Sequence, residues 1–198
     1  MAIDVKTLLI AARDTLQQPK VGARALLQMG LPANVGWMAL VLMAVVSAVV
    51  SALSFAMSAP GEDQALDQAL MLLFRNPIQL AFYQGVALLI GIMLIYGVGR
   101  MFGGRGSLNQ AVLLIAWLEF IMLLLQLAQF VILPISTPMA AAIGMFGFVL
   151  FLWLLTNFIA VLHGFESNVA VFMAIVGTIL AVSFAAAILI VAFVGLGA

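Results

Sequence analysis

The chain contains five apolar runs that are each long enough to cross a lipid bilayer, near residues 36–58, 77–99, 109–133, 139–162 and 169–195. An α-helix rises about 1.5 Å per residue and the hydrocarbon core is about 30 Å thick, so roughly 20 residues make one crossing. Only 7% of the 198 residues are charged, and the mean hydropathy is +1.32. Soluble domains carry about a quarter charged residues. We therefore predict an all-α, polytopic integral membrane protein with five transmembrane helices.

The segment before the first run, residues 1–35, is amphipathic. Its apolar side chains lie roughly on one helical face: Ile3, Leu8, Leu9, Ala12 and Leu16. Pro19 suits the first turn of a second short helix. We consider two interpretations, a helix lying in the membrane interface and a short cap packed on the bundle. The chain thus divides into a cytoplasmic or interfacial segment, 1–35, and a transmembrane domain, 36–198.

Basic residues in short loops set the orientation of a membrane protein. With the N-terminus inside, six of the seven basic residues face the cytoplasm: Lys6, Arg13, Lys20, Arg24, Arg100 and Arg105. Only Arg75, at the end of the polar and acidic segment 60–76, then lies on the other side. We predict that the N-terminus is inside and the C-terminus outside.

One acidic residue, Glu119, lies in the middle of the third apolar run. A charged side chain at the bilayer centre costs roughly 3 kcal/mol on insertion scales, so this carboxyl group needs a partner, a proton or a water-filled cavity. Gln126 and Gln129 follow it on the same helical face. The first run carries a matching stripe of serines: Ser47, Ser51, Ser54 and Ser58.

These two polar stripes lie on spans that run in the same direction. Matching their depths pairs Glu119 with Ser47 and Gln126 with Ser54. We therefore expect the serine stripe, or Tyr83 and Gln84 of the second run, to shield the Glu119 face. The carboxyl group is then either a structural hydrogen-bonding group between helices or a proton or cation site. The absence of a second intramembrane acid, lysine or arginine favours the structural role.

Small residues also form stripes, which allow helices to approach closely in a membrane. The fifth run has a stripe of five: Ala170, Ala174, Gly177, Ala181 and Ala185. The fourth run has a shorter one, formed by Ala140, Gly144 and Gly147. Asn157 is a further candidate for a hydrogen bond between helices.

Few residues suggest catalysis or metal binding. The chain has no cysteine and one histidine, which excludes thiolate sites and multi-histidine metal sites within the chain. No GxSxG, HExxH or GxxxxGK[ST] motif occurs. We interpret His163 and Glu166 as a polar anchor at the membrane interface. We therefore expect no catalytic residue, metal, cofactor or nucleotide, and the net charge of zero gives no reason to expect nucleic acid.

A glycine-rich basic turn, Gly103-Gly104-Arg105-Gly106-Ser107, precedes the third run. We expect Ser107 or Asn109 to cap the following helix. Arg100 and Arg105 are candidates for contacts with anionic lipid headgroups.

The amphipathic N-terminus, the five spans and this glycine turn together resemble the Yip-domain family of membrane proteins. The resemblance covers roughly residues 18–193 and is most specific at Gly103-Gly104-x-Gly106-Ser107. It implies a non-enzymatic membrane protein, and the short N-terminal segment indicates the bacterial type, in the cytoplasmic membrane. The DLYGP-type segment and the GY-rich motif of eukaryotic members are absent, which argues against a GTPase partner.

Two functions follow as hypotheses. The first is a non-enzymatic protein that organises or assists partner proteins in the membrane, with lipids and other membrane proteins as its partners. The second is a small ion, proton or solute permease that uses Glu119, with Gln126 and Gln129 lining a path.

Overall fold

The computed structural model describes residues 4–57, 71, 74 and 76–196. The helices among them are α1 (Val5–Gln17), α2 (Pro19–Gln28), α3 (Ala33–Met57), α5 (Pro77–Met101), α6 (Leu108–Ile132), α7 (Thr137–His163) and α8 (Asn168–Leu196). Five of these helices are long and apolar enough to cross a membrane. The prediction of an all-α, five-helix membrane protein is therefore confirmed. Ser58, Arg75 and most of the acidic segment 60–76 lie outside the described residues.

Local sequence signals explain where several helices begin and end. Asn76 accepts hydrogen bonds from the backbone N–H groups of Ile78 and Gln79, and Pro77 begins α5. Ser107, rather than Asn109, caps α6 through a reciprocal capping box with Gln110. This arrangement satisfies backbone donors that the first helical turn leaves free.

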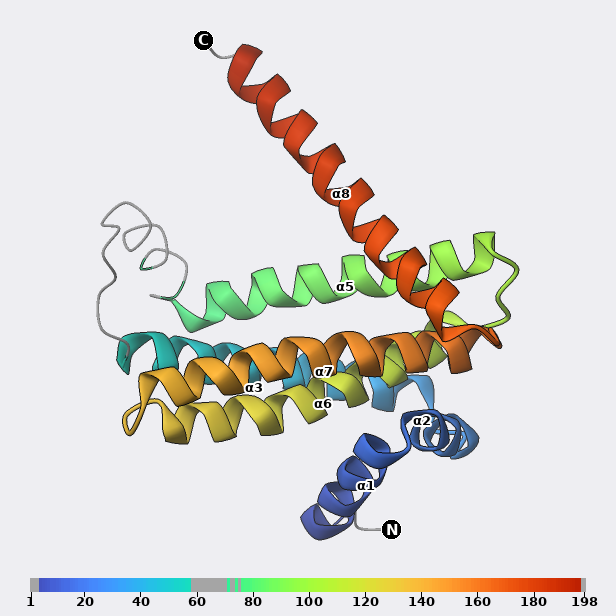
Figure 1. The fold of residues 1–198 in the computed structure, drawn as a ribbon, viewed down its shortest axis with the longest axis horizontal. Coiled ribbons are helices and arrows are strands. Elements are labelled where there is room, and N and C mark those ends of the chain that lie inside the picture. The colour runs from blue at the N-terminus through green and yellow to red at the C-terminus, as the bar shows by residue number, and fades with distance from the viewer. Residues whose placement is uncertain (1–3, 58–70, 72–73, 75, 197–198) are drawn as a thin grey trace.

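Helix α6 lies at the centre of the molecule and contacts α2, α3, α5 and α7. In Figure 1, α3, α6 and α7 run alongside one another, and α5 lies beside this group. Helix α8 packs on α7 near its start and then leaves the bundle at a steep angle (Figure 1). The core is formed by apolar side chains that include Ile92, Leu114, Leu118, Leu154 and Phe158.

Helices α1 and α2, together called the N-terminal hairpin, meet at a steep angle at the end of the bundle where α6 begins (Figure 1). Pro19 begins α2, as predicted, and α2 packs on α6 and α7. The buried residues of the hairpin are small: Ala12, Thr15, Pro19 and Ala23. Leu9 and Leu16 of the predicted apolar face are exposed. The packed-cap interpretation therefore accounts for one face of this segment and leaves its larger apolar side chains free to meet lipid.

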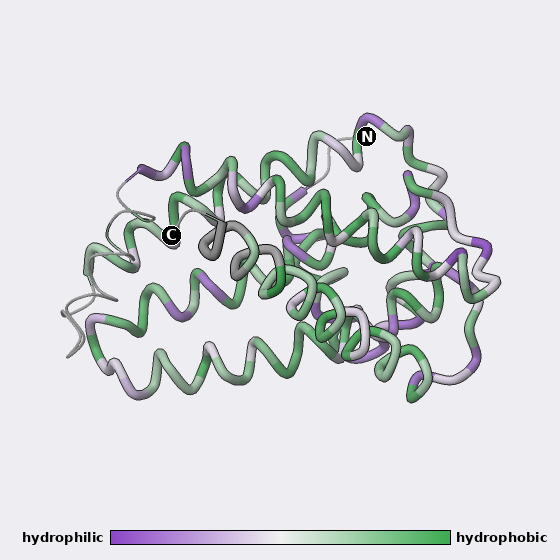
Figure 2. Tube along the Cα trace, turned by 90° about the horizontal axis from the view of Figure 1, so that it is seen from above, coloured by the Kyte–Doolittle hydropathy of each residue, from purple (hydrophilic) through white to green (hydrophobic). Residues whose placement is uncertain are grey.

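The hydropathy of the chain follows this architecture. Figure 2 shows mostly hydrophobic residues along the spans and hydrophilic residues concentrated in the N-terminal helices and the loops. A few hydrophilic positions interrupt the spans. These interruptions mark the polar contacts described next.

Candidate intramembrane site

A group of polar side chains joins α3, α5 and α6 inside the bundle. The Gln126 amide donates to the Ser51 hydroxyl, at 2.7 Å, and to the Ser47 carbonyl oxygen, at 3.1 Å. The Gln84 amide donates to the Ser47 hydroxyl. Because lipid provides little hydrophobic reason for helices to associate, such contacts help to hold the bundle together. The polar stripes of α3 and α6 therefore do face each other.

Their alignment differs from the one expected from depth. Ser47 contacts Gln126 and not Glu119. The two groups that Gln126 contacts, on Ser51 and Ser47, lie three and seven residues before the expected partner Ser54, which is a shift of one to two helical turns. The spans are not level because Gly36 packs directly on the backbone of Leu113, which fixes the offset between α3 and α6. Ser54 instead donates to the Val50 carbonyl oxygen within α3, at 2.8 Å.

Replacing Gln126 with leucine is expected to destabilise the transmembrane domain by about 0.6–1.7 kcal/mol, between the average and the largest value measured for polar contacts between membrane helices. The substitution removes both hydrogen bonds that the Gln126 amide donates to α3 and introduces an apolar side chain of similar size. The free energy of unfolding in bicelles, measured by steric trapping, tests this expectation. Gln79→Leu is the control, because the Gln79 side-chain amide donates to the exposed Tyr83 on the same helix and to no other described residue. Equal effects of the two changes would contradict the bridging role.

Glu119 lies on the same face of α6 as Gln126, two turns nearer the start of the helix. It lines a cavity of about 740 Å³ between α5, α6, α7 and α8. It makes no hydrogen bond or ion pair with another described residue. Gln84 lines the same cavity, whereas Tyr83 points elsewhere and accepts a hydrogen bond from Gln79. Of the groups expected to shield Glu119, only Gln84 therefore shares its surroundings.

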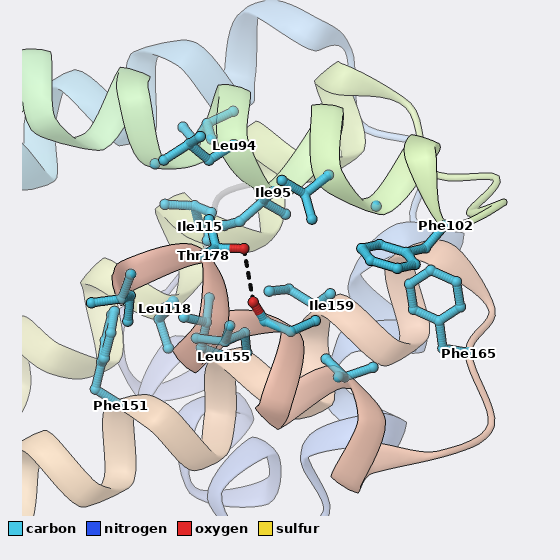
Figure 3. A pocket seen from close by; sticks show the side chains of 18 of the residues that line it. Leu94, Ile95, Phe102, Ile115, Leu118, Phe151, Leu155, Ile159, Phe165 and Thr178 are labelled. Atoms are coloured by element: carbon cyan, nitrogen blue, oxygen red, sulfur yellow. Dashed lines mark hydrogen bonds between the residues drawn. The ribbon is translucent and has the colours of Figure 1, made fainter. Parts of the chain in front are cut away.

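The walls of this cavity are mainly apolar. Figure 3 shows Leu94 and Ile95 from α5, Leu118 from α6, and Leu155 from α7. Phe102 and Phe165 lie at one end (Figure 3). Thr178 of α8 also lines the cavity, but its hydroxyl is already donated to the Ala174 carbonyl oxygen, at 2.7 Å (Figure 3).

The charged residues around the cavity are acidic. Glu119 lies inside it, and Glu166 of the α7–α8 loop is the other charged residue among the described residues that line it. No lysine or arginine belongs to this described lining. The described part of the chain also contains no cluster of three or more residues that would hold a metal ion. The arrangement therefore presents an acidic group in apolar surroundings.

Gln126 and Gln129 do not line the Glu119 cavity. They line a smaller cavity of about 290 Å³ with Ser51, Ser54 and Phe55. Gln129 also packs against Gly144 of α7. The candidate polar residues are therefore separated: Glu119 lines the larger cavity, and Ser51, Ser54, Gln126 and Gln129 line the smaller one. Ser47 lines neither cavity and contacts Gln84 of α5 and Gln126 of α6.

The small-residue stripes differ in how the fold uses them. Ala140 is buried, and an added methyl group at Gly147 would lie 2.6 Å from Leu125, so the α7 stripe packs closely on α6. In α8, Gly177 has no described atom within contact distance of such a methyl group, and Ala181 and Ala185 are exposed. No other described helix therefore packs on most of the small-residue stripe of α8.

His163 occupies a different position from the interfacial anchor expected for it. The side chain is 2% exposed, and its Nε2 atom lies 3.2 Å from the Ile95 carbonyl oxygen of α5. Because a carbonyl oxygen only accepts hydrogen bonds, Nε2 carries the proton in this contact. Gly99 and Gly104 pack against the two sides of the imidazole ring, and Glu166 is exposed in the adjacent loop. His163 therefore joins the end of α7 to the end of α5.

This packing explains the glycine-rich turn. Gly103 has a positive φ of 83°, which favours glycine. Gly104 and Gly106 leave no space for a side chain beside His163 and Leu162, respectively. Arg100 and Arg105 are both exposed, which is compatible with contacts to lipid headgroups.

The sequence did not identify the partners in two further contacts between helices. The Trp117 indole donates to the Thr15 hydroxyl at 3.2 Å and so joins the N-terminal hairpin to α6. The Asn168 amide donates to the Asn157 side-chain oxygen at 3.0 Å, which confirms the expected contact between helices at Asn157. Buried tryptophan and asparagine side chains usually need a hydrogen-bond partner, but sequence does not tell which one they find.

The comparisons with known proteins agree with this architecture. A family model described as the Yip1 domain matches residues 13–195. No curated protein and no solved structure matches the chain. The Yip1 match covers both the glycine-rich turn and all five long helices. The chain therefore belongs to the Yip1 domain family of membrane proteins.

Proposed function

We propose that this protein is a non-enzymatic membrane protein that binds partner proteins within the bilayer, and that a partner transmembrane helix enters between α5 and α8. The observation that carries this proposal is the 740 Å³ cavity that α5 and α8 border. Only 6% of the membrane-spanning stretch of α5 and 11% of that of α8 is buried, against 44% for α6 and α7. Two helices with so little internal packing have surface available for another helix.

The residues on both sides of the opening support a helical partner. Ala87 and Gly91 of α5 line the cavity four residues apart, and so do Ala170 and Ala174 of α8. Residues four apart share a helical face. Small residues on such a face let another backbone approach closely, and close packing drives helix association in lipid.

We also propose that the protein lies in a bacterial cytoplasmic membrane with its N-terminus inside and its C-terminus outside. The distribution of lysine and arginine supports this orientation. It places the exposed Arg100 and Arg105 at the cytoplasmic surface, where they meet anionic headgroups.

Site-specific photocrosslinking in native membranes tests the partner-binding function. We expect a photoreactive side chain at Gly91 or Ala174, both in the cavity wall, to form adducts with one reproducible membrane protein. A probe at Phe148 of α7 is the control, because that side chain is 63% exposed and lies outside the cavity lining. Identical adducts from all three positions, or lipid adducts alone, would contradict the proposal.

A permease is the second candidate, and the cavity around Glu119 is the observation that favours it. If the carboxyl group carries protons, purified protein in liposomes will give a pH-dependent flux that Glu119→Gln abolishes. The location of Gln126 and Gln129 in a separate cavity argues for the first function, because these side chains do not extend the Glu119 cavity.

A further inference from the structure

We propose that the cavity selects transmembrane helices that carry a lysine or arginine near the middle of the bilayer, and that Glu119 pairs with this basic residue. This inference rests on the proposed function, because it specifies which partner helices would enter between α5 and α8. It assigns Glu119 a role in recognition, because no described residue of the chain pairs with its carboxyl group.

The first argument is charge. Glu119 has no ion-pair partner among the described residues, and the described lining of its cavity contains no basic side chain. A carboxylate and a basic side chain are each costly in hydrocarbon, and pairing lowers the cost of both. A neutral helix in the cavity would leave the carboxyl group without a partner, whereas a basic helix supplies one.

The second argument is depth. Glu119 is the twelfth residue of the 25-residue helix α6, about 16 Å along its axis. The amino groups of lipids lie at the headgroup level, since the hydrocarbon core alone is about 30 Å thick. A basic side chain on a transmembrane helix reaches this depth, and the headgroup of an ordinary lipid does not.

The third argument is the shape of the walls. The pairs Ala87/Gly91 and Ala170/Ala174 place small residues on both α5 and α8. Such walls accept a helical backbone. The partner that fits the charge, the depth and the walls together is a transmembrane helix with a central basic residue.

Binding of designed peptides to the full-length protein in phosphatidylcholine nanodiscs tests this inference. The probes are leucine-rich peptides of about 23 residues, long enough to span the bilayer, with a central lysine or a central methionine. Fluorescence energy transfer between labelled peptide and protein gives the two affinities. We expect the lysine peptide to bind about 3- to 20-fold more tightly, the range that polar contacts between membrane helices contribute.

Variants separate the contribution of Glu119 from that of the cavity. Glu119→Gln should reduce the affinity for the lysine peptide to that for the methionine peptide, and Glu119→Asp should retain most of the preference. Ala174→Trp should weaken the binding of both peptides, because the indole occupies part of the cavity beside the small residues of α8. Size-exclusion profiles and helical content equal to those of the wild type establish that each variant is folded.

The possible results also separate this inference from the function on which it depends. Equal binding of both peptides, with a loss in Ala174→Trp, would support the partner-binding function and overturn selection by charge. Absence of binding by either peptide would overturn both. A lysine preference that survives Glu119→Gln would also overturn the role of Glu119. Dodecylammonium, a small amphiphilic cation, provides a further test. If it displaces the lysine peptide from the wild-type protein, and if its binding depends on Glu119 and is as tight as that of the lysine peptide, the site takes small amphiphilic cations. The assignment of a helix as the ligand would then be wrong.

Discussion

Gly99→Ala is expected to destabilise the transmembrane domain by about 1–3 kcal/mol, the usual cost of inserting a methyl group into a well-packed site. The new Cβ atom would lie well inside van der Waals contact with three atoms of the His163 imidazole ring. The ring has little freedom to move, because it is buried, contacts the Ile95 carbonyl oxygen and packs against Gly104 on another side. Steric trapping in bicelles measures the change in the free energy of unfolding.

Gly97→Ala is the matched control on the same helix. A methyl group at Gly97 meets no described atom within 4 Å, so this change should leave stability within about 0.5 kcal/mol of the wild type. The double variant Gly99→Ala with His163→Ala provides a second test, because removing the ring makes space for the methyl group. Its destabilisation should be smaller than the sum of the two single effects. Equal costs at Gly97 and Gly99, or simple additivity, would contradict the proposed packing.

The glycine-rich turn shows what sequence does and does not convey. The motif was recognisable, and its Ser107 cap could be predicted from local rules, because capping involves residues three positions apart. Its packing against His163 and Leu162 joins segments that lie more than 50 residues apart, so no local pattern identifies it. The single histidine therefore resembled an interfacial anchor, although it lies buried between α5 and α7.

The polar stripes illustrate a second limit. Helical periodicity identified the faces of α3 and α6 that carry polar residues, and the contact of Gln126 with Ser47 and Ser51 shows that these faces meet. The relative height of the two helices depends on the close approach of Gly36 to Leu113, which depth counting does not include. The resulting error of one to two turns explains why Glu119 lines the cavity on this face of α6 and does not meet the predicted serine.

The stripe of α8 shows a third limit. Small residues at helical spacing indicate a surface suited to close packing, but they do not say which helix covers it. In α7 the stripe packs on α6, whereas in α8 it stays largely exposed from Gly177 onward. Intramolecular and intermolecular helix contacts use the same residues, so the two uses give the same sequence pattern.

The second large effect is expected at the N-terminal hairpin, where Gly22→Val should release α1 from α2. A Cβ atom at Gly22 would overlap the hydroxyl and Cβ atoms of Thr15, which is itself buried and accepts the hydrogen bond of Trp117. The contact is tight because α1 and α2 cross at these two residues, and the backbone of Thr15 also lies 3.0 Å from the added atom. Limited trypsin digestion in nanodiscs should reveal the release as faster cleavage at the exposed Arg13 and Arg24.

An overpacking cost of about 1–3 kcal/mol corresponds to a rise of about 5- to 150-fold in cleavage rate, provided that cleavage tracks the open population. Ala25→Val is the control, since it adds the same β-branched side chain at an exposed position of α2.

In a background where Trp37 and Trp153 are replaced by phenylalanine, the emission of Trp117 reports loss of the Thr15 contact directly. Unchanged cleavage together with unchanged Trp117 emission would show that the hairpin does not depend on this crossing. Faster cleavage in Gly22→Val alone would show that the close contact of Gly22 with Thr15, rather than the exposed apolar side chains Leu9 and Leu16, holds α1 on α2. Those two exposed side chains are then available to anchor the hairpin in the membrane interface.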